Sequence, residues 1–274
     1  MKKRLAIIGC GRLGRALGRL WTVRQIFIVN QVLNRSLQHA RDAAAFIGAG
    51  IPVDRIEDVQ PADVYLIATP DDHIAETCSV LAGQGLLADS GIVFHCSGSL
   101  SSGILHRASA AGAAVASIHP IRSFADPVAV AEHFSGTWCG VEGDAAALEL
   151  LLPAFHAIGA RTVAVDPDKK TLYHAAAVFA CNYLVTLLDV ARQNAVAAGI
   201  EPDHALPLLQ QLVRETVDNV FKHGPEAALT GPIARGDIAT AERQWQAVAQ
   251  ANPAHGTLYR ELMQATMALA ARRS

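Results

Sequence analysis

Arg4-Leu5-Ala6-Ile7-Ile8 form a short apolar run near the start of the chain, and Gly9-Cys10-Gly11-Arg12-Leu13-Gly14 follow it directly. Apolar residues then recur at helical spacing through residues 16–20. This order predicts a strand, a tight glycine turn and a helix, whose glycines serve the strand exit, the approach of a pyrophosphate and close helix–strand packing. The helix N-terminus would offer its free N–H groups to the phosphates. We therefore expect a dinucleotide-binding unit; an ordinary strand–helix turn, which also uses glycines, is the alternative.

The composition is typical of a well-buried globular protein. The chain has 274 residues, of which 51% are hydrophobic and 18% charged, unlike a disordered chain. Its net charge is −2 and it carries no basic stripe, which argues against a nucleic-acid partner. The five cysteines are odd in number, widely spaced and without a CxxC pair. This pattern favours reduced thiols in the cytoplasm over disulfides or a zinc site.

No stretch of the sequence is expected to cross a membrane. The apolar run at residues 4–8 is too short for a signal peptide, which needs roughly 7–15 apolar residues. Residues 175–190 come closest to a spanning segment, but Asn182 and Asp189 interrupt them. We expect a cytoplasmic protein without a membrane partner. No His, Asp and Glu cluster has the spacing of a metal site, so no metal is expected.

Strand and helix patterns alternate through residues 1–166. Helical patterns cover residues 37–49 and 145–158, and runs of strand length occupy residues 26–33, 51–53, 63–68, 91–94, 113–118, 137–141 and 161–165. Such alternation predicts an α/β fold, a Rossmann domain with a doubly wound parallel sheet that binds NAD(P).

The strand signals stop at Asp166-Pro167, and helical patterns follow at residues 169–198, 205–223, 238–250 and 257–271. Residues 167–274 are therefore expected to form an all-helical second domain. Helices cannot extend a parallel sheet, and four helices alone cannot bury this much apolar surface. We expect the domain to close the active cleft and to form a homodimer.

The end of the second predicted strand indicates which dinucleotide is bound. NAD sites place an acidic residue about twenty positions after the glycines, where it binds the ribose hydroxyls. Asn34 stands there instead, followed by Arg35 and Ser36. A guanidinium and a hydroxyl would bind a 2′-phosphate that a carboxylate would repel, so NADP (NADPH) is favoured over NAD. The alternative is that Arg35 is a solvated strand-end residue.

Further cofactor contacts are expected where other strands end, because ligands of doubly wound sheets bind at the carboxyl ends of the strands. The loop after residues 63–68 and the one after residues 91–94 occupy such places. Together with the glycine turn, the expected cofactor-binding residues are Gly9, Cys10, Gly11, Arg12, Leu13, Gly14, Asn34, Arg35, Ser36, Ala68, Thr69, Pro70 and Ser97.

This layout resembles the superfamily of pyrroline-5-carboxylate reductase, ketopantoate reductase and the β-hydroxyacid dehydrogenases, in which a helical domain like the C-terminal one of 6-phosphogluconate dehydrogenase follows a Rossmann domain. Four motifs are similar to those of one bacterial family: Phe94-His95-Cys96-Ser97-Gly98, His119-Pro120-Ile121-Arg122-Ser123-Phe124, residues 173–183 and residues 229–237. Its members are Rossmann-like proteins with a C-terminal domain of unknown function, labelled as candidate NADP oxidoreductases. The resemblance covers nearly the whole chain and implies the fold, but no substrate.

Four polar residues are candidates for catalysis. Ser97 and His119 end the fifth and sixth predicted strands, and the His119-Pro120 pair looks like one in prephenate dehydrogenases, where the histidine meets the substrate. A histidine titrates near neutral pH, so we expect His119 to donate the proton, with His174 second. Ser97 and Asn182 would orient the acceptor group. The alternatives are a capping serine, structural histidines and a satisfied core amide.

The helix that carries His174 and Asn182 departs from related dehydrogenases, which place a lysine four residues before the asparagine. Val178 stands at that position. At 100° per residue, His174 would lie about 80° around the helix from Asn182. Arg235 could hold a substrate carboxylate, while Asp237 is expected only to cap a helix. His73, His95 and His106 are interpreted as incidental.

These features predict an NADP-dependent oxidoreductase that transfers a hydride between NADPH and a small keto or imino compound. The missing lysine keeps open a second interpretation, a catalytically inactive NADPH-binding sensor or assembly protein on the same fold.

Overall fold

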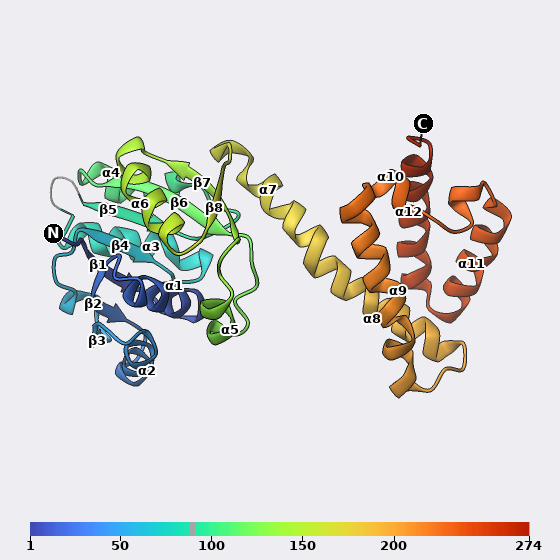
Figure 1. Cartoon of the computed structure of the whole chain (residues 1–274), viewed down its shortest axis with the longest axis horizontal. Helices are drawn as coiled ribbons and strands as arrows, with labels where there is room; N and C mark the ends of the chain where they lie inside the picture. Colours follow the sequence, from blue (N-terminus) through green and yellow to red (C-terminus); the bar gives the residue numbers. More distant parts are fainter. Residues whose placement is uncertain (88–90, 274) are drawn as a thin grey trace. The chain divides into compact units, whose positions relative to one another are not determined.

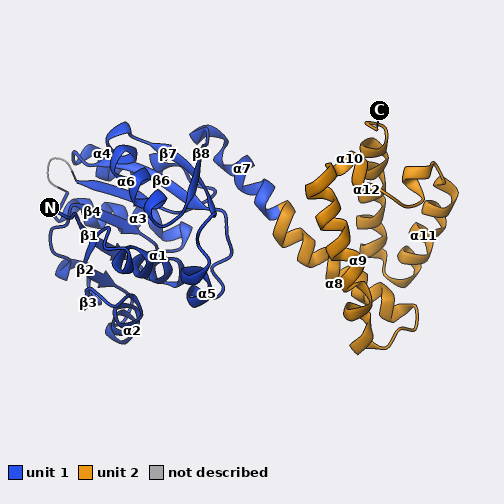
Figure 2. Cartoon of the chain, viewed as in Figure 1, with its two compact units in different colours: residues 1–178 blue, residues 179–274 orange. Residues whose placement is uncertain are grey.

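The computed structural model describes residues 1–87 and 91–273 and divides the chain into two compact units, residues 1–178 and residues 179–274 (Figures 1 and 2). The first unit contains an eight-stranded sheet with helices on both faces. Its elements are β1 (Arg4–Ile8), α1 (Arg12–Val23), β2 (Ile28–Leu33), α2 (Leu37–Ile47), β3 (Ile51–Val53), β4 (Val64–Ile67), α3 (Asp71–Gly83), β5 (Ile92–His95), α4 (His106–Ala110), β6 (Ala114–Pro120), α5 (Pro127–Glu132), β7 (Trp138–Gly143), α6 (Ala145–Ala157), β8 (Arg161–Ala164) and α7 (Lys170–Ala177).

The strand order is β3-β2-β1-β4-β5-β6-β7-β8, which confirms the predicted α/β class and every predicted strand. The sheet is not wholly parallel, however, because β7 runs antiparallel to β6. The chain leaves β6, passes through α5 and returns at the same edge, where the Ile121 N–H donates to Trp138 O at 2.8 Å. A connection that stays at one edge reverses the next strand, whereas a crossover keeps it parallel. The second strand begins at Ile28, two residues later than predicted, because Gln25 takes a left-handed turn conformation (φ 56°) before it.

Alternation along β1 divides the core of the first unit into two layers. Leu5 and Ile7 belong to the cluster with α1, α2 and α6, whereas Ala6 and Ile8 belong to the cluster with α3 and α4. Trp21 of α1 lies fully buried in the first cluster. Parallel strands buried on both faces are apolar without interruption, which is why this run could be recognised in the sequence.

The second unit contains α8 (Tyr183–Ala197), α9 (Pro202–His223), α10 (Pro225–Ala228), α11 (Ile238–Ala251) and α12 (Pro253–Ala270). The predicted helix over residues 169–198 is divided into α7 and α8 by a π-helical turn, Val178–Asn182. Within residues 179–273, Ala205 and Ala241 are the only apolar side chains that are fully buried. Several large apolar side chains of this unit are exposed instead, among them Leu208, Leu212 and Phe221.

One helical run, Pro167–Ala197, reaches the length and mean hydropathy (1.5) of a membrane-crossing helix, and none of its most apolar stretch is buried within the chain. A single run of this kind is weak evidence for a membrane span, because exposed interface helices have the same composition. Large exposed side chains on this run include Leu172, Phe179 and Val185, each about 70% exposed.

Candidate functional site

The glycine turn between β1 and α1 has the geometry that its sequence predicts. Gly9 has φ +78°, and a Cβ atom there would lie 2.5 Å from Thr69 Cγ2, so both its conformation and its neighbour require glycine. The N–H groups of Gly9 and Cys10 donate to Leu33 O at 3.0 and 3.1 Å. The amides left for a phosphate are therefore those of the first turn of α1, which begins at Arg12.

A cavity of about 600 Å³ lies against this turn at the carboxyl ends of the strands. Nine of the thirteen residues expected to bind the cofactor line it: Gly9, Gly11, Arg12, Leu13, Asn34, Arg35, Ala68, Thr69 and Pro70. Space is open where a Cβ of Gly11 would stand, and the buried Thr69 Oγ1 has no hydrogen-bond partner among the described residues. An open backbone, an unpaired hydroxyl and two arginines suit the phosphates and hydroxyls of a dinucleotide.

Asn34, Arg35 and Ser36, which follow β2, make different contacts. The Asn34 side-chain amide donates to Cys10 O at 3.0 Å and to His39 O at 3.3 Å, so it ties the glycine turn to α2. Ser36 Oγ accepts the His39 N–H at 3.3 Å and caps α2. Arg35 is exposed and lines the cavity. Of the three, Arg35 is the residue that offers a free charge.

The loop after β5 meets two histidines. A Cβ on Gly98 would overlap His174 Nδ1 and would lie 2.9 Å from His119 Nε2, so the backbone of Gly98 packs directly against both imidazoles. The two rings cross at a centroid distance of 5.6 Å. His119 Nδ1 is 3.0 Å from the Tyr173 hydroxyl, while the buried His174 Nδ1 has no partner among the described residues. The structure thus brings together three of the four predicted catalytic positions: Ser97, His119 and His174.

Asp71 connects this loop to the cofactor cavity. It follows Pro70, which lines the cavity, and its Oδ2 accepts the Ser97 hydroxyl at 2.7 Å and the Ser99 hydroxyl at 2.9 Å. On the other side, the Ser97 N–H donates to His95 Nδ1 at 3.1 Å. The interpretation of His95 as incidental is therefore wrong, because its buried ring supports the serine loop.

The electrostatics of His119 correct one premise of the sequence analysis. Burial, followed by the charges of the neighbouring His174 and Lys170, lowers its pKa to about 4, although Asp71 acts in the opposite direction. His119 is therefore neutral at pH 7 and is not an imidazolium acid. Burial also raises the pKa of Tyr173 to about 12, so its phenol keeps its proton. A neutral imidazole can still polarise a carbonyl group through its N–H.

A buried ion pair beneath the loop was missed by the sequence analysis. Lys170 Nζ donates to Ser97 O at 3.0 Å and to Ser117 Oγ, and lies 3.6 Å from Glu142 Oε1. The Glu142 carboxylate accepts the Ser102 N–H at 2.8 Å and the Ser102 hydroxyl at 2.7 Å. Burial lowers the pKa of Lys170. The available signal was Glu142 at the end of an apolar strand, but nothing in the sequence connects it to a lysine 28 positions later.

We expect the stability of the first unit to fall as the pH drops from 6.5 to 4. Burial lowers the pKa of the fully buried His95 to about 4. Between pH 4 and 6.5, the unfolded chain, with a histidine pKa near 6.5, therefore binds a proton at this residue that the folded state does not bind. Stability is fully present above pH 6.5, and about 2–3 kcal/mol is lost by pH 4 through this group. Urea unfolding at several pH values would measure it.

The variant His95→Gln should reduce this pH dependence without abolishing it, because the pKa of His119 is also lowered to about 4. His106→Gln, at an exposed position of α4, should leave it unchanged. An equal slope in His95→Gln and the unaltered protein would contradict the assignment.

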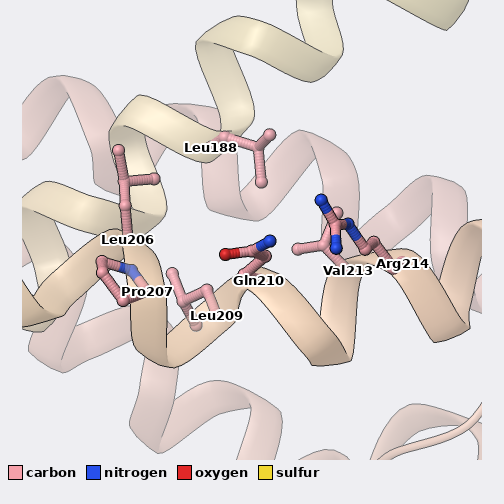
Figure 3. Close-up of a pocket in the computed structure, with 7 residues that line it drawn as sticks. All are labelled: Leu188, Leu206, Pro207, Leu209, Gln210, Val213 and Arg214. Carbon is pink, nitrogen blue, oxygen red and sulfur yellow. The ribbon is translucent and has the colours of Figure 1, made fainter.

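Two predicted site residues belong to the second unit. Asn182 is exposed in the π-helical turn, and Arg235 is exposed as the last residue of a short 3₁₀ helix, so their roles stay predictions. The capping role predicted for Asp237 is confirmed, because its Oδ1 accepts the Thr240 N–H at 3.1 Å. A mainly apolar hollow of about 340 Å³ between α8 and α9 is lined by Leu188, Leu206, Pro207, Leu209, Gln210, Val213 and Arg214 (Figure 3). None of the predicted site residues lines it.

Comparison with family models now adds to this geometry. A model described as a Rossmann-like domain matches residues 1–120, and a model described as a domain of unknown function, DUF2520, matches residues 137–266. The chain is a Rossmann-like protein with a DUF2520 domain. No curated protein matches its sequence significantly. The DUF2520 match begins at β7, so it includes Glu142, Lys170 and His174.

Solved structures share the fold along the whole chain. Protein TM1727 from Thermotoga maritima is 27% identical, with a TM-score of 0.75 and coverage of 97% of this chain and 98% of that one. BF3122 from Bacteroides fragilis, named as a candidate NADP oxidoreductase, is 21% identical, with a TM-score of 0.76 and the same coverage. A Plasmodium falciparum pyrroline carboxylate reductase with NADP bound is 13% identical, with a TM-score of 0.60 and 98% coverage of both chains. This DUF2520 protein thus has the fold of NAD(P)-dependent reductases.

Proposed function

We propose that this protein is an NADP-dependent oxidoreductase acting on a small keto or imino compound in the cytoplasm. One observation carries the proposal: β6 and helix α7 place two imidazole nitrogens at Gly98, and Asp71, next to the cavity, hydrogen-bonds this loop. Bound NADPH would supply the hydride. The chain would supply a place for the acceptor group beside His119 and His174.

In this proposal, His119 holds the oxygen or nitrogen of the acceptor. If the Tyr173 hydroxyl donates to Nδ1, His119 carries its own proton on Nε2, the nitrogen that faces Gly98. A neutral N–H at that point can hydrogen-bond the group on which negative charge develops, and water would supply the proton that completes the reduction. Ser97 fixes the loop through its hydrogen bond to Asp71.

A screen of keto and imino acids for NADPH oxidation tests the proposal. Turnover of at least one such compound is expected, with saturation in both NADPH and the substrate. An NADPH-binding sensor or assembly protein, the second interpretation, would bind NADPH and turn over none of the compounds.

The cofactor preference should depend on Arg35. We expect tighter binding of NADPH than of NADH, and Arg35→Ala should weaken NADPH binding about tenfold or more with little effect on NADH, since a charge-assisted hydrogen bond contributes about 1.5–3 kcal/mol. Fluorescence titration with both cofactors measures the ratio. Arg55→Ala is the matched control, because Arg55 is exposed and pairs with Glu57 outside the cavity. An unchanged ratio in Arg35→Ala would count against the role of this residue.

We expect a homodimer assembled on the C-terminal helices. These helices expose Leu208 and Leu212 (62% each) and Phe221 (86%), more apolar surface than a monomer usually leaves in water. Light scattering at micromolar concentration should give twice the chain mass, and Leu208→Glu should shift it towards the monomer. Val23→Glu, at an equally exposed position of α1, should not. A monomeric unaltered protein would refute the prediction.

A further inference from the structure

Helix α7, which carries Tyr173 and His174, buries few of its side chains against the sheet. In α7, all of whose residues are described, Lys170 is the only fully buried residue. Leu172 and Thr171 are exposed, and Tyr173 and His174 are half-buried. The position of this helix against the sheet therefore depends on Lys170 at its first residue, together with the half-buried Tyr173 and His174.

Lys170 contacts residues of two strands and of the loop that follows a third. Its Nζ donates to Ser97 O after β5 and to Ser117 Oγ on β6, and it pairs with Glu142 of β7. The side chains of Lys170 and Glu142 are 2% and 6% exposed. An ammonium group with three acceptors in fixed directions determines both the depth and the rotation of the helix.

The spacing of residues along α7 lets the contacts of Lys170 position the side chains that meet His119. Tyr173 and His174 stand three and four residues after Lys170, so all three lie on one face of the helix. That face meets His119, through the 3.0 Å contact of the Tyr173 hydroxyl with Nδ1 and the crossing of the two imidazoles. The same Lys170 ammonium holds the carbonyl of Ser97, the residue before Gly98.

Stability alone does not explain a buried pair at this point. Apolar residues of similar volume usually stabilise a core as well as a buried ion pair does, because each charge loses its hydration. What an apolar pair cannot provide is direction, since it leaves the helix free to slide or rotate.

We propose that Lys170 and Glu142 are positioning residues: they fix α7 against β6, β7 and the loop after β5, so that Tyr173 and His174 meet His119 at Gly98. The role in turnover rests on the proposed function. The geometric role does not, so the two can fail separately.

The test compares the full-length double variant Lys170→Met/Glu142→Gln, which removes both charges and leaves neither unpaired, with Lys169→Met. Lys169 is the matched control, since it precedes Lys170 and its side chain is 71% exposed. The imidazole resonances of labelled histidines are followed by NMR across pH 4–8, together with NADPH affinity, melting temperature and kcat. The charged or titratable groups around His119 are His174, Lys170, Tyr173, Asp71, His95, Glu142 and Cys139.

In the double variant we expect NADPH affinity within twofold of the unaltered protein, a kcat at least tenfold lower, and His119 titrating at higher pH than in the unaltered protein. Lys169→Met should change none of these. An unaltered kcat and unaltered histidine resonances in a folded double variant would overturn the proposal. A double variant with the kcat and the melting temperature of the unaltered protein would also overturn it, because two neutral side chains would then replace the ion pair without loss.

If the double variant does not fold, Ser117→Ala removes a single acceptor of the ammonium and should shift the same resonances and lower kcat about threefold; no change in either would overturn the proposal. If no substrate is found, the proposed function fails and the NMR titration still decides the positioning role.

Discussion

Replacement of His119 by alanine is expected to lower kcat at least 100-fold and to leave NADPH binding within about twofold. His119 is the imidazole whose Nε2 faces Gly98, and its other nitrogen is held by Tyr173. Loss of one hydrogen-bond donor to a developing negative charge typically costs about 10²–10³ in kcat. The cofactor cavity does not include His119, so the affinity for NADPH has no reason to change. Steady-state kinetics with a substrate from the screen, together with NADPH titration, measure both quantities.

Two further variants make this result specific. Tyr173→Phe keeps the ring and removes only the hydroxyl that orients Nδ1, so it should cost about tenfold, a fraction of the effect of His119→Ala. His106→Ala removes an exposed histidine of α4 and should have no effect. If His119→Ala turns over like the unaltered protein, the donor is another group and the site has to be reassigned.

The largest loss of stability is expected from Trp21→Ala, at about 3–5 kcal/mol. Trp21 is fully buried, and its ring lies edge-on to Phe27 at 5.4 Å, Phe94 at 6.3 Å and Phe155 at 5.3 Å. Its indole N–H donates to Ala154 O at 3.1 Å, which joins α1 to α6. Truncation removes these contacts and leaves a cavity between helices and sheet that cannot collapse without moving both helices.

Urea unfolding followed by far-UV circular dichroism would measure the change in the free energy of unfolding. Trp138→Ala is the control, because Trp138 is 48% exposed at the start of β7 and should cost less than about 1 kcal/mol. A loss in Trp21→Ala no larger than that of the control would contradict the central role of this ring.

The parts of the fold that sequence could predict are those determined by local pattern. The glycine turn at Gly9–Gly14 and the apolar strand before it have one satisfactory local conformation, and the helix cap at Asp237 follows from neighbouring residues. Ser36, expected to bind the cofactor, caps α2 instead. The reversal of β7 could not be read in the same way, because strand direction depends on where α5 returns the chain.

In the candidate site, too, local pattern could be read from the sequence and tertiary packing could not. Ser97 and His119 could be found because the carboxyl ends of neighbouring parallel strands meet at one edge. The contact of Lys170 with Glu142, and the support of Ser97 by His95, depend on tertiary packing that no spacing records. The low pKa of His119 was missed for the same reason, since its main cause is burial.

The π-helical turn at Val178–Asn182 changes how positions along this part of the chain can be compared. Its i→i+5 bonding takes up one more residue than an α-helical turn, so the angle between residues on its two sides no longer equals 100° times their separation. The value of about 80° between His174 and Asn182, obtained for a regular helix, does not hold across it. The comparison with the lysine–asparagine spacing of related dehydrogenases counts four residues back from Asn182, to Val178. In this chain the same count crosses a change of helical phase, so equivalent positions have to be assigned separately on α7 and α8.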